Sequence, residues 1–174
     1  MTVLDIVTVG DPVLRERARE LSTEELRSDE VQRLIDDMIE TKRAAHGAGI
    51  AANQVGRALR VAVVEVQPGN PRYPYKPPVD LTVIVNPEIE PVDDELFAVN
   101  EGCLSVPGLW APTVRAQHAV VEGFDVDGKP LRLEGDGLMA RCLQHEVDHL
   151  DGTVFLDRLT GEARKNALRA LRSR

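Results

Sequence analysis

The sequence predicts an α+β fold, in which antiparallel β-sheets pack around a central helix and a further helix forms the C-terminal end. Three observations lead to this expectation. An amphipathic helical pattern follows Ser28, valine-rich segments separated by turn signals fill the middle of the chain, and a second helical pattern runs from Leu138 to about Leu150. The last segment, Thr160 to Arg174, is again amphipathic.

The first helix has a clear beginning and end. Ser28 is a good N-cap, and Asp29 and Glu30 fall in the first turn, where the helix dipole favours acidic side chains. Gly47 and Gly49 end the helix. One face is apolar at the spacing of an amphipathic helix, through Val31, Leu34, Ile35, Met38 and Ile39.

The middle of the chain reads as a series of strands. Asp127-Gly128 is a strong hairpin signal between the last two, and Asn86-Pro87 closes the second. The predicted strands are Leu59 to Val66, Leu81 to Val85, Ala98 to Leu104, His118 to Val126 and Pro130 to Leu133. Between the first two, Gln67 to Asp80 holds five prolines and is predicted to be a loop, either a flap over a site or a tolerated insertion.

Length and composition limit the function. With 174 residues, 43% of them hydrophobic, the chain is expected to form one domain over residues 1–174. The net charge of −8 argues against general nucleic-acid binding, and we expect no sequence-specific nucleic-acid partner. Without an apolar run of roughly 20 residues or a signal-peptide pattern, we expect a cytoplasmic protein with no membrane partner. Cys103 and Cys142 are then expected to be thiols or ligands.

The strongest chemical signal is the segment from His145 to His149. On a helix these two histidines lie one turn apart, about 6 Å along the axis, so both imidazoles can bind one metal ion. Glu146 lies beside the first of them, where it can take a proton from an attacking water molecule. The alternative is a helix that carries two histidines by chance.

A catalytic metal of this kind needs a third protein ligand and an open coordination position. Cys142 lies on the same helix face, but it is about 10.5 Å along the axis from His149, and we interpret it as a small apolar residue under the site. Cys103 comes from a separate segment and is the preferred ligand. Taken alone, Cys103 would be better interpreted as a buried structural cysteine, and the ligand role gains weight only because the helix motif lacks a third ligand.

The small-residue segment Gly47 to Gln54 is a third candidate. Its glycines and alanines allow close approach of a substrate, and the amide of Gln54 can donate to a developing oxyanion. A tight packing turn with a solvated glutamine is the alternative.

Together the segments Gly47 to Gln54, Glu101 to Ser105 and Gln144 to His149 resemble the three signature motifs of the peptide deformylases. The similarity extends to Gly10 to Leu14 and to Asp151 to Arg158, and so covers almost the whole chain. Ile50, where the family usually has leucine, and Trp110, at a variable position, affect substrate preference and not reaction type.

This resemblance implies removal of the formyl group, as formate, from formyl-methionyl nascent peptides. It implies Cys103, His145 and His149 as metal ligands and Glu146 as the general base. The oxyanion would be held by the Gln54 amide and the backbone N–H of Leu104. The substrate peptide would be bound along Gly47, Gly49, Ile50, Glu101 and Gly102.

The resemblance also points to a cofactor and to a partner. The cofactor is one divalent ion, Fe(2+), with Zn(2+), Ni(2+) or Co(2+) able to use the same ligands. The C-terminal segment is locally basic, which indicates either a solvated helix face or docking to the ribosome. Its cations are Arg164, Lys165, Arg169, Arg172 and Arg174.

Three rival interpretations stay open at this point. A peptidase with the same helix motif would need a later histidine or glutamate ligand, and only Glu162 follows. A binding protein with a closed structural site would need four protein ligands. A deformylase-like protein with other formylated substrates fits the sequence equally. His46 and His118 receive no role. Asp148 and Asp151 are expected to be surface charges, with orientation of a ligand histidine as the less favoured alternative.

Overall fold

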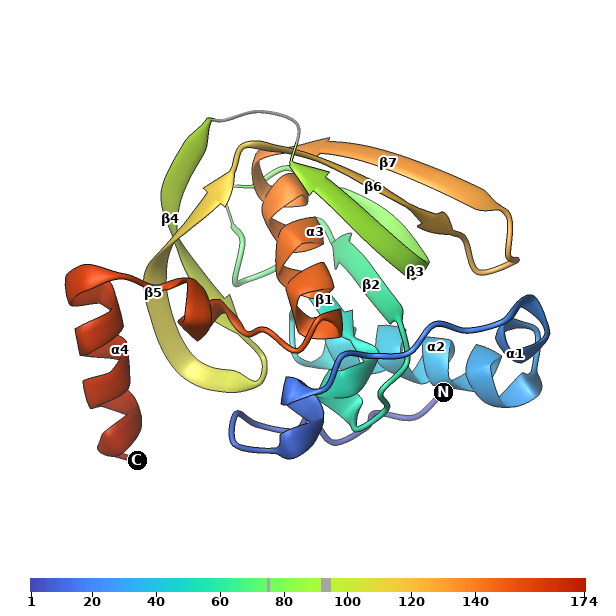
Figure 1. Ribbon diagram of the computed structural model, residues 1–174, viewed down its shortest axis with the longest axis horizontal. Helices are drawn as coiled ribbons and strands as arrows, with labels where there is room; N and C mark the ends of the chain where they lie inside the picture. Colours follow the sequence, from blue (N-terminus) through green and yellow to red (C-terminus); the bar gives the residue numbers. More distant parts are fainter. Residues whose placement is uncertain (75, 92–94) are drawn as a thin grey trace.

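The computed structural model describes residues 1–74, 76–91 and 95–174. Helix α3 (Gly137–Leu150) runs through the centre of the molecule, between a large sheet on one side and a β-hairpin on the other (Figure 1). The large sheet is antiparallel, with the order β1-β2-β3-β6-β7. Its strands are β1 (Gly49–Ala51), β2 (Val61–Val66), β3 (Val79–Pro91), β6 (His118–Phe124) and β7 (Pro130–Asp136). The expected α+β fold is confirmed.

The hairpin consists of β4 (Leu96–Cys103) and β5 (Val106–Ala116), which pair only with each other among the described residues. Its register places Glu101 opposite Ala111 and Gly102 opposite Trp110. Irregularity at Gly102 and Cys103 shifts the register by the end of β4. This break in the ladder lies directly beside α3, where it positions Cys103.

The N-terminal helices begin as the sequence predicts. Helix α2 (Asp29–Ala44) is capped by Ser28, whose side chain accepts a hydrogen bond from the backbone N–H of Val31. The preceding short helix α1 (Thr23–Leu26) has a reciprocal capping box between Ser22 and Glu25. The apolar face of α2 packs against β1 and β2 and closes the largest core cluster.

Two features of the sheets differ from the sequence prediction. Strand β3 continues through Asn86-Pro87 to Pro91, because a bulge absorbs the irregular residues. Asn86 takes a left-handed backbone conformation (φ 51°), and its side-chain amide exchanges two hydrogen bonds with the backbone of Leu21.

Strand β5 was not predicted, because Pro107, Gly108 and Pro112 are turn formers. A two-stranded hairpin leaves free edges on which proline is tolerated.

The C-terminal helix α4 (Gly161–Arg172) lies on the outer side of β5, away from the large sheet (Figure 1). Ala167 and Leu171 pack into a core cluster with Leu109 and Phe155. Short 3-10 helices complete the chain at η1 (Pro12–Arg15), η2 (Ala52–Val55) and η3 (Phe155–Arg158). None of the helices in the described ranges is both long and apolar enough to cross a bilayer.

Candidate metal centre and active site

Three soft donor atoms converge at the middle of α3. The Nε2 atom of His149 lies 3.1 Å from Nε2 of His145 and 3.3 Å from Sγ of Cys103. All three ligand atoms lie within 4.8 Å of one another, and all three residues are buried. Within the described residues this is the one cluster of its kind that could hold a metal ion.

The fold explains why these residues meet. His145 and His149 are one turn apart on α3, and their rings approach with centroids 4.8 Å apart. Cys103 reaches them from the end of β4, across the helix. Cys142 is buried outside the cluster, and burial raises the pKa of its thiol to about 12. The sequence argument that preferred Cys103 over Cys142 is therefore supported by the arrangement, and both cysteines are free thiols.

The donor set fits a metal ion. A tetrahedral ion with bonds of about 2.0–2.3 Å to nitrogen and sulfur would separate its ligand atoms by roughly 3.4–3.6 Å. This is close to the 3.1 and 3.3 Å that separate Nε2 of His149 from the other two atoms. Nδ1 of His145 lies 2.5 Å from the Glu101 carboxylate, so its proton is directed there and the lone pair of Nε2 is free for the ion. Two imidazole nitrogens and a thiolate are the ligands that iron(II), zinc and similar ions prefer.

Glu146 lies beside this cluster, and one of its carboxylate oxygens accepts no hydrogen bond from the described residues. Its Oε2 atom is buried and has no hydrogen-bond partner among the described residues. Burial raises the pKa of the Glu146 carboxyl to about 7, and His145 would oppose that shift only when protonated. A carboxylate with this pKa and a free oxygen is suited to accept a proton near neutral pH.

The backbone around Glu146 has no room for side chains. A Cβ atom on Gly49 would lie 2.5 Å from Oε1 of Glu146, and a Cβ on Gly47 would lie 2.7 Å from Cδ1 of Leu104. Glycine therefore lets this segment approach both side chains closely, and the constraint is stricter at Gly49, where Cγ and Cδ of Glu146 also lie 2.9 Å from the Cβ position. This explains the small residues of the segment before Gln54.

Gln54 approaches the cluster from η2. Its Oε1 atom accepts a hydrogen bond from the backbone N–H of Ala51 at 2.9 Å, which fixes the amide. Its Nε2 donates to Oγ of Ser105 at 3.1 Å and lies 3.7 Å from Sγ of Cys103. An N–H donor is therefore held next to the three candidate ligand atoms, as an oxyanion-stabilising role requires.

A buried ionic network supports His145 from behind. Arg115 of β5 donates two hydrogen bonds to Glu101, at 3.0 and 2.6 Å, and one to Asp148 at 2.6 Å. Arg158 then binds Asp148 through two further hydrogen bonds, at 3.1 and 2.7 Å. The network connects the metal-binding helix, both strands of the hairpin and η3.

This network corrects the expectation for Asp148 and changes the role assigned to Glu101. Asp148 was expected to be a surface charge, but it is only 9% exposed and ion-paired, because Arg115 and Arg158 compensate its burial. Asp151, by contrast, is partly exposed and pairs with Arg60. Glu101 borders the cavity, but its carboxylate is bound by Arg115 and His145, so it positions a ligand.

The cluster opens into a cavity of about 390 Å³, a size typical of small-ligand sites. The loop between β2 and β3 forms one wall through Arg72, Tyr73, Pro74 and Lys76. Residue 75 of the predicted Gln67 to Asp80 loop lies outside the described residues. The sequence-predicted residues that line the cavity are Gly47, Gly49, Gln54, Glu101, Gly102, Cys103, Leu104, His145 and Glu146.

Two predicted site residues do not line it. Ile50 is fully buried in the core beside α2 and does not line the cavity, so it is not placed to contact a peptide directly. His149 is also fully buried, behind the other two donors.

Comparison with known proteins decides the family. The family model described as polypeptide deformylase matches residues 3–165, nearly the whole chain. The chain belongs to the polypeptide deformylase family. Deformylases hydrolyse the N-formyl group from the formyl-methionyl end of nascent peptides, and this is the function of the chain.

Individual relatives agree with this assignment. A peptide deformylase of Acidothermus cellulolyticus is 45% identical over 174 residues, which cover 99% of this chain and 87% of the relative. Peptide deformylase 2 of Streptomyces avermitilis is 43% identical over 172 residues, covering 96% and 85%. The Met-Ala-Ser-bound class I type b deformylase of Acinetobacter baumannii has a TM-score of 0.86 at 39% identity, with 91% of this chain and 99% of that chain covered.

The sequence did not reveal the residues that support the deformylase site. Arg115 was missed because its strand was not predicted; once β5 is known, its inward position between buried residues identifies it as a paired charge. Arg141 was also missed. Its guanidinium donates to backbone carbonyls of β4 and β5, including Val99 and Thr113, and so fastens the hairpin to α3.

Proposed function

We propose that the deformylase acts through a single divalent metal ion held by Cys103, His145 and His149, with Glu146 as the general base. The observation that carries this proposal is the free, buried Oε2 atom of Glu146 beside three converging ligand atoms. A structural metal site would need a fourth protein ligand, and no fourth histidine, cysteine or acid joins this cluster among the described residues. An open position and an adjacent base favour catalysis.

A divalent ion bound there supplies Lewis-acid activation of a water molecule and of the formyl carbonyl. Glu146 takes the proton of the attacking water and passes it to the leaving amine. The Nε2 amide of Gln54 and the backbone N–H of Leu104 donate to the oxygen that gains negative charge. Gln54 is already held in place through Ala51, so little reorganisation is needed.

The substrate is a formyl-methionyl peptide that lies along the glycine-rich walls of the cavity. Gly47, Gly49 and Gly102 expose backbone there, which suits pairing with an extended peptide. Glu101 acts by orienting His145, and Ile50 contributes to the core instead of contacting the peptide. The similar deformylase of Acinetobacter baumannii binds Met-Ala-Ser in its crystal structure, so formyl-Met-Ala-Ser is a suitable test substrate.

Iron(II) is the proposed ion, and zinc, nickel or cobalt would use the same donors. Protein purified without oxygen is assayed for formate release from formyl-Met-Ala-Ser, with metal content measured on the same sample. Chelation should abolish release, and iron(II) should restore it. Absence of release from fully metal-loaded protein would contradict the proposal. Cys103→Ala should lose the metal and the activity together.

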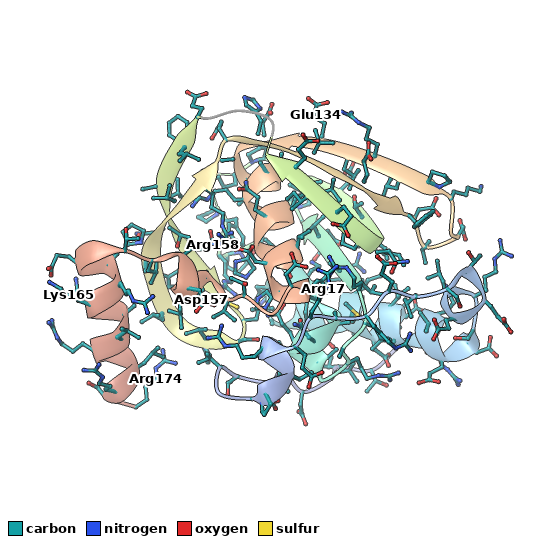
Figure 2. All side chains as sticks on the ribbon, in the orientation of Figure 1. Arg17, Glu134, Asp157, Arg158, Lys165 and Arg174 are labelled. Atoms are coloured by element: carbon teal, nitrogen blue, oxygen red, sulfur yellow. The ribbon has the colours of Figure 1, made fainter. Side chains whose placement is uncertain are left out.

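A basic C-terminal helix supports a proposal that the enzyme docks on the ribosome. Ala167 and Leu171 bind α4 to the body of the protein, while Lys165 projects outward (Figure 2). Exposed cations on such a helix can contact RNA phosphates. Replacing Arg164 and Arg169 by glutamine should reduce co-sedimentation with ribosomes, without change in activity on a tripeptide. Unchanged co-sedimentation would contradict docking.

The same substrate class supports two further parts of the proposal. Formyl-methionyl chains are produced at the ribosome, so we place the enzyme in the cytoplasm. We also propose that residues 1–174 act as a single catalytic domain, because α2 and α3 pack on opposite faces of the same large sheet: Val61 and Val63 of β2 lie in one core cluster with α2, and Val64 and Val66 lie in another with α3.

A further inference from the structure

At the rim of the cavity an arginine side chain stacks on a tryptophan ring. The guanidinium of Arg72 lies over the ring of Trp110, 4.9 Å from its centroid. Gly102 lies against the same ring: a Cβ atom there would come within 2.8 Å of Trp110 Cε2. The indole is thus fixed between the backbone of β4 and a cation from the loop between β2 and β3.

This contact lies close to the metal-binding residues. Gly102 directly precedes Cys103, and Gly102, Arg72 and Trp110 all line the cavity. Trp110 is 44% exposed, whereas Cys103 is 4% exposed, so the arginine and the indole mark the mouth and the cysteine marks the floor. When the formyl group of a bound peptide lies at the floor of the cavity, the residues that follow methionine lie at its mouth.

The mouth is cationic although the chain as a whole has a net charge of −8. Arg72 and Lys76 both line it, and within the described ranges neither forms an ion pair with a carboxylate. The acidic residues of the cavity do not neutralise these cations. Glu101 forms an ion pair with Arg115, and Glu146 is buried beside the metal-binding residues. The neighbouring cation Arg141 is held by backbone carbonyls of the hairpin.

We infer that Arg72, held on Trp110, is a specificity-determining residue that favours formyl-methionyl peptides with an acidic side chain directly after methionine. This inference rests on the proposed deformylase mechanism. A carboxylate at that place pairs with the guanidinium at the mouth, and the indole reduces the cost of ordering the arginine because it already holds the side chain. A lysine at the same place meets two cations, Arg72 and Lys76.

The test compares kcat/KM for formyl-Met-Glu-Ser, formyl-Met-Ala-Ser and formyl-Met-Lys-Ser with metal-loaded enzyme at low and high salt. The wild type should prefer glutamate over lysine by about two- to fivefold, the range expected for a partly exposed ion pair, and less at high salt. Arg72→Gln should bring the ratio close to one, and Arg72→Glu should invert it. Trp110→Ala should weaken the preference, whereas Trp110→Phe keeps an aromatic face and should retain it.

Arg57→Gln is the matched control, because it removes one positive charge from a surface arginine that pairs with Glu30 and does not line the cavity. It should leave the ratio unchanged. Equal glutamate-to-lysine ratios in the wild type and Arg72→Glu would overturn the inference, while formate release would still support the proposed function. If no peptide is deformylated, the mechanism fails, and the affinities of the products Met-Glu-Ser and Met-Lys-Ser still decide the role of Arg72.

Discussion

Nδ1 of His145 lies 2.5 Å from Oε1 of Glu101, so a residue of β4 orients a histidine of α3 that we propose as a metal ligand. Carboxylate partners of this kind fix the tautomer and raise the basicity of the ligand. Glu101 is itself only 9% exposed and is held by Arg115. The hairpin therefore contributes Cys103 directly and His145 indirectly.

Glu101→Gln should weaken metal binding by about 10- to 100-fold, because the amide keeps the shape of the side chain but loses its charge. Metal affinity is measured by competition with a chelator. Asn100→Asp, a change of charge one residue away on the exposed side of the strand, serves as the control. Unaltered affinity in Glu101→Gln would show that the carboxylate does not support the site.

Arg115→Met should lower the free energy of unfolding by about 3–5 kcal/mol, because it leaves Glu101 and Asp148 buried without their shared cation. Urea denaturation of the metal-free proteins measures the loss without a contribution from metal binding. The control is Arg15→Met, whose pair with Asp157 is half exposed and should contribute about 1 kcal/mol or less. Similar losses in the two variants would contradict the account.

Gly49→Ala should reduce kcat strongly, because its methyl group would displace the carboxylate of Glu146, whose Oε1 lies 2.5 Å from the Cβ position. Gly47→Ala should have a smaller effect, since the new methyl meets the flexible end of Leu104. Both variants should retain their metal. The comparison needs steady-state kinetics with metal content measured in parallel, and equal activities would argue against a fixed position of Glu146.

Glu65 predicts a pH dependence of stability. Its buried carboxylate binds Arg43 at 3.0 and 2.8 Å and lies 3.8 Å from Lys42. Burial by itself raises the pKa of Glu65, but these cations lower it below the ordinary value of 4.5. A lowered folded-state pKa contributes stability above pH 4.5, and this contribution is lost as the pH falls toward the folded-state pKa.

Glu65→Gln should therefore destabilise the protein by about 3 kcal/mol at pH 7, and the difference from the wild type should shrink below pH 4.5. Denaturant titrations across pH 3 to 7 give both quantities. Glu162→Gln, which breaks an exposed pair with Lys165, should show no such trend. A difference in unfolding free energy between Glu65→Gln and wild type that stays constant with pH would mean that the pKa of Glu65 is the same in the folded and unfolded states.

The sequence predicted those parts of the site that lie within short segments. The two histidines and Glu146 follow from one helical turn, and the glycines before Gln54 stand out locally as a run of small residues. The contacts that explain those glycines, with Glu146 and Leu104, are distant in sequence and follow only from the fold. The buried network could not be read in this way, because Arg115 meets Asp148 across 33 residues of sequence. Such pairing depends on how the hairpin packs on α3, and no local pattern records it.

The same distinction explains the errors in the fold. Asn86-Pro87 resembles a strand end, but the exchange of hydrogen bonds with Leu21 stabilises it as a bulge within β3. Pro112 argues locally against a strand, yet it lies in β5, where the free edges of the hairpin tolerate it. In both cases a tertiary contact outweighs the local preference.

The central claim is that Glu146 moves the proton for hydrolysis at a metal held by Cys103, His145 and His149. The most direct test is formate release from formyl-Met-Ala-Ser by Glu146→Gln, purified without oxygen and assayed for metal. We predict one equivalent of bound metal and a loss of kcat of at least about 100-fold, the scale of general-base catalysis. Near wild-type turnover by the fully loaded variant would contradict the account.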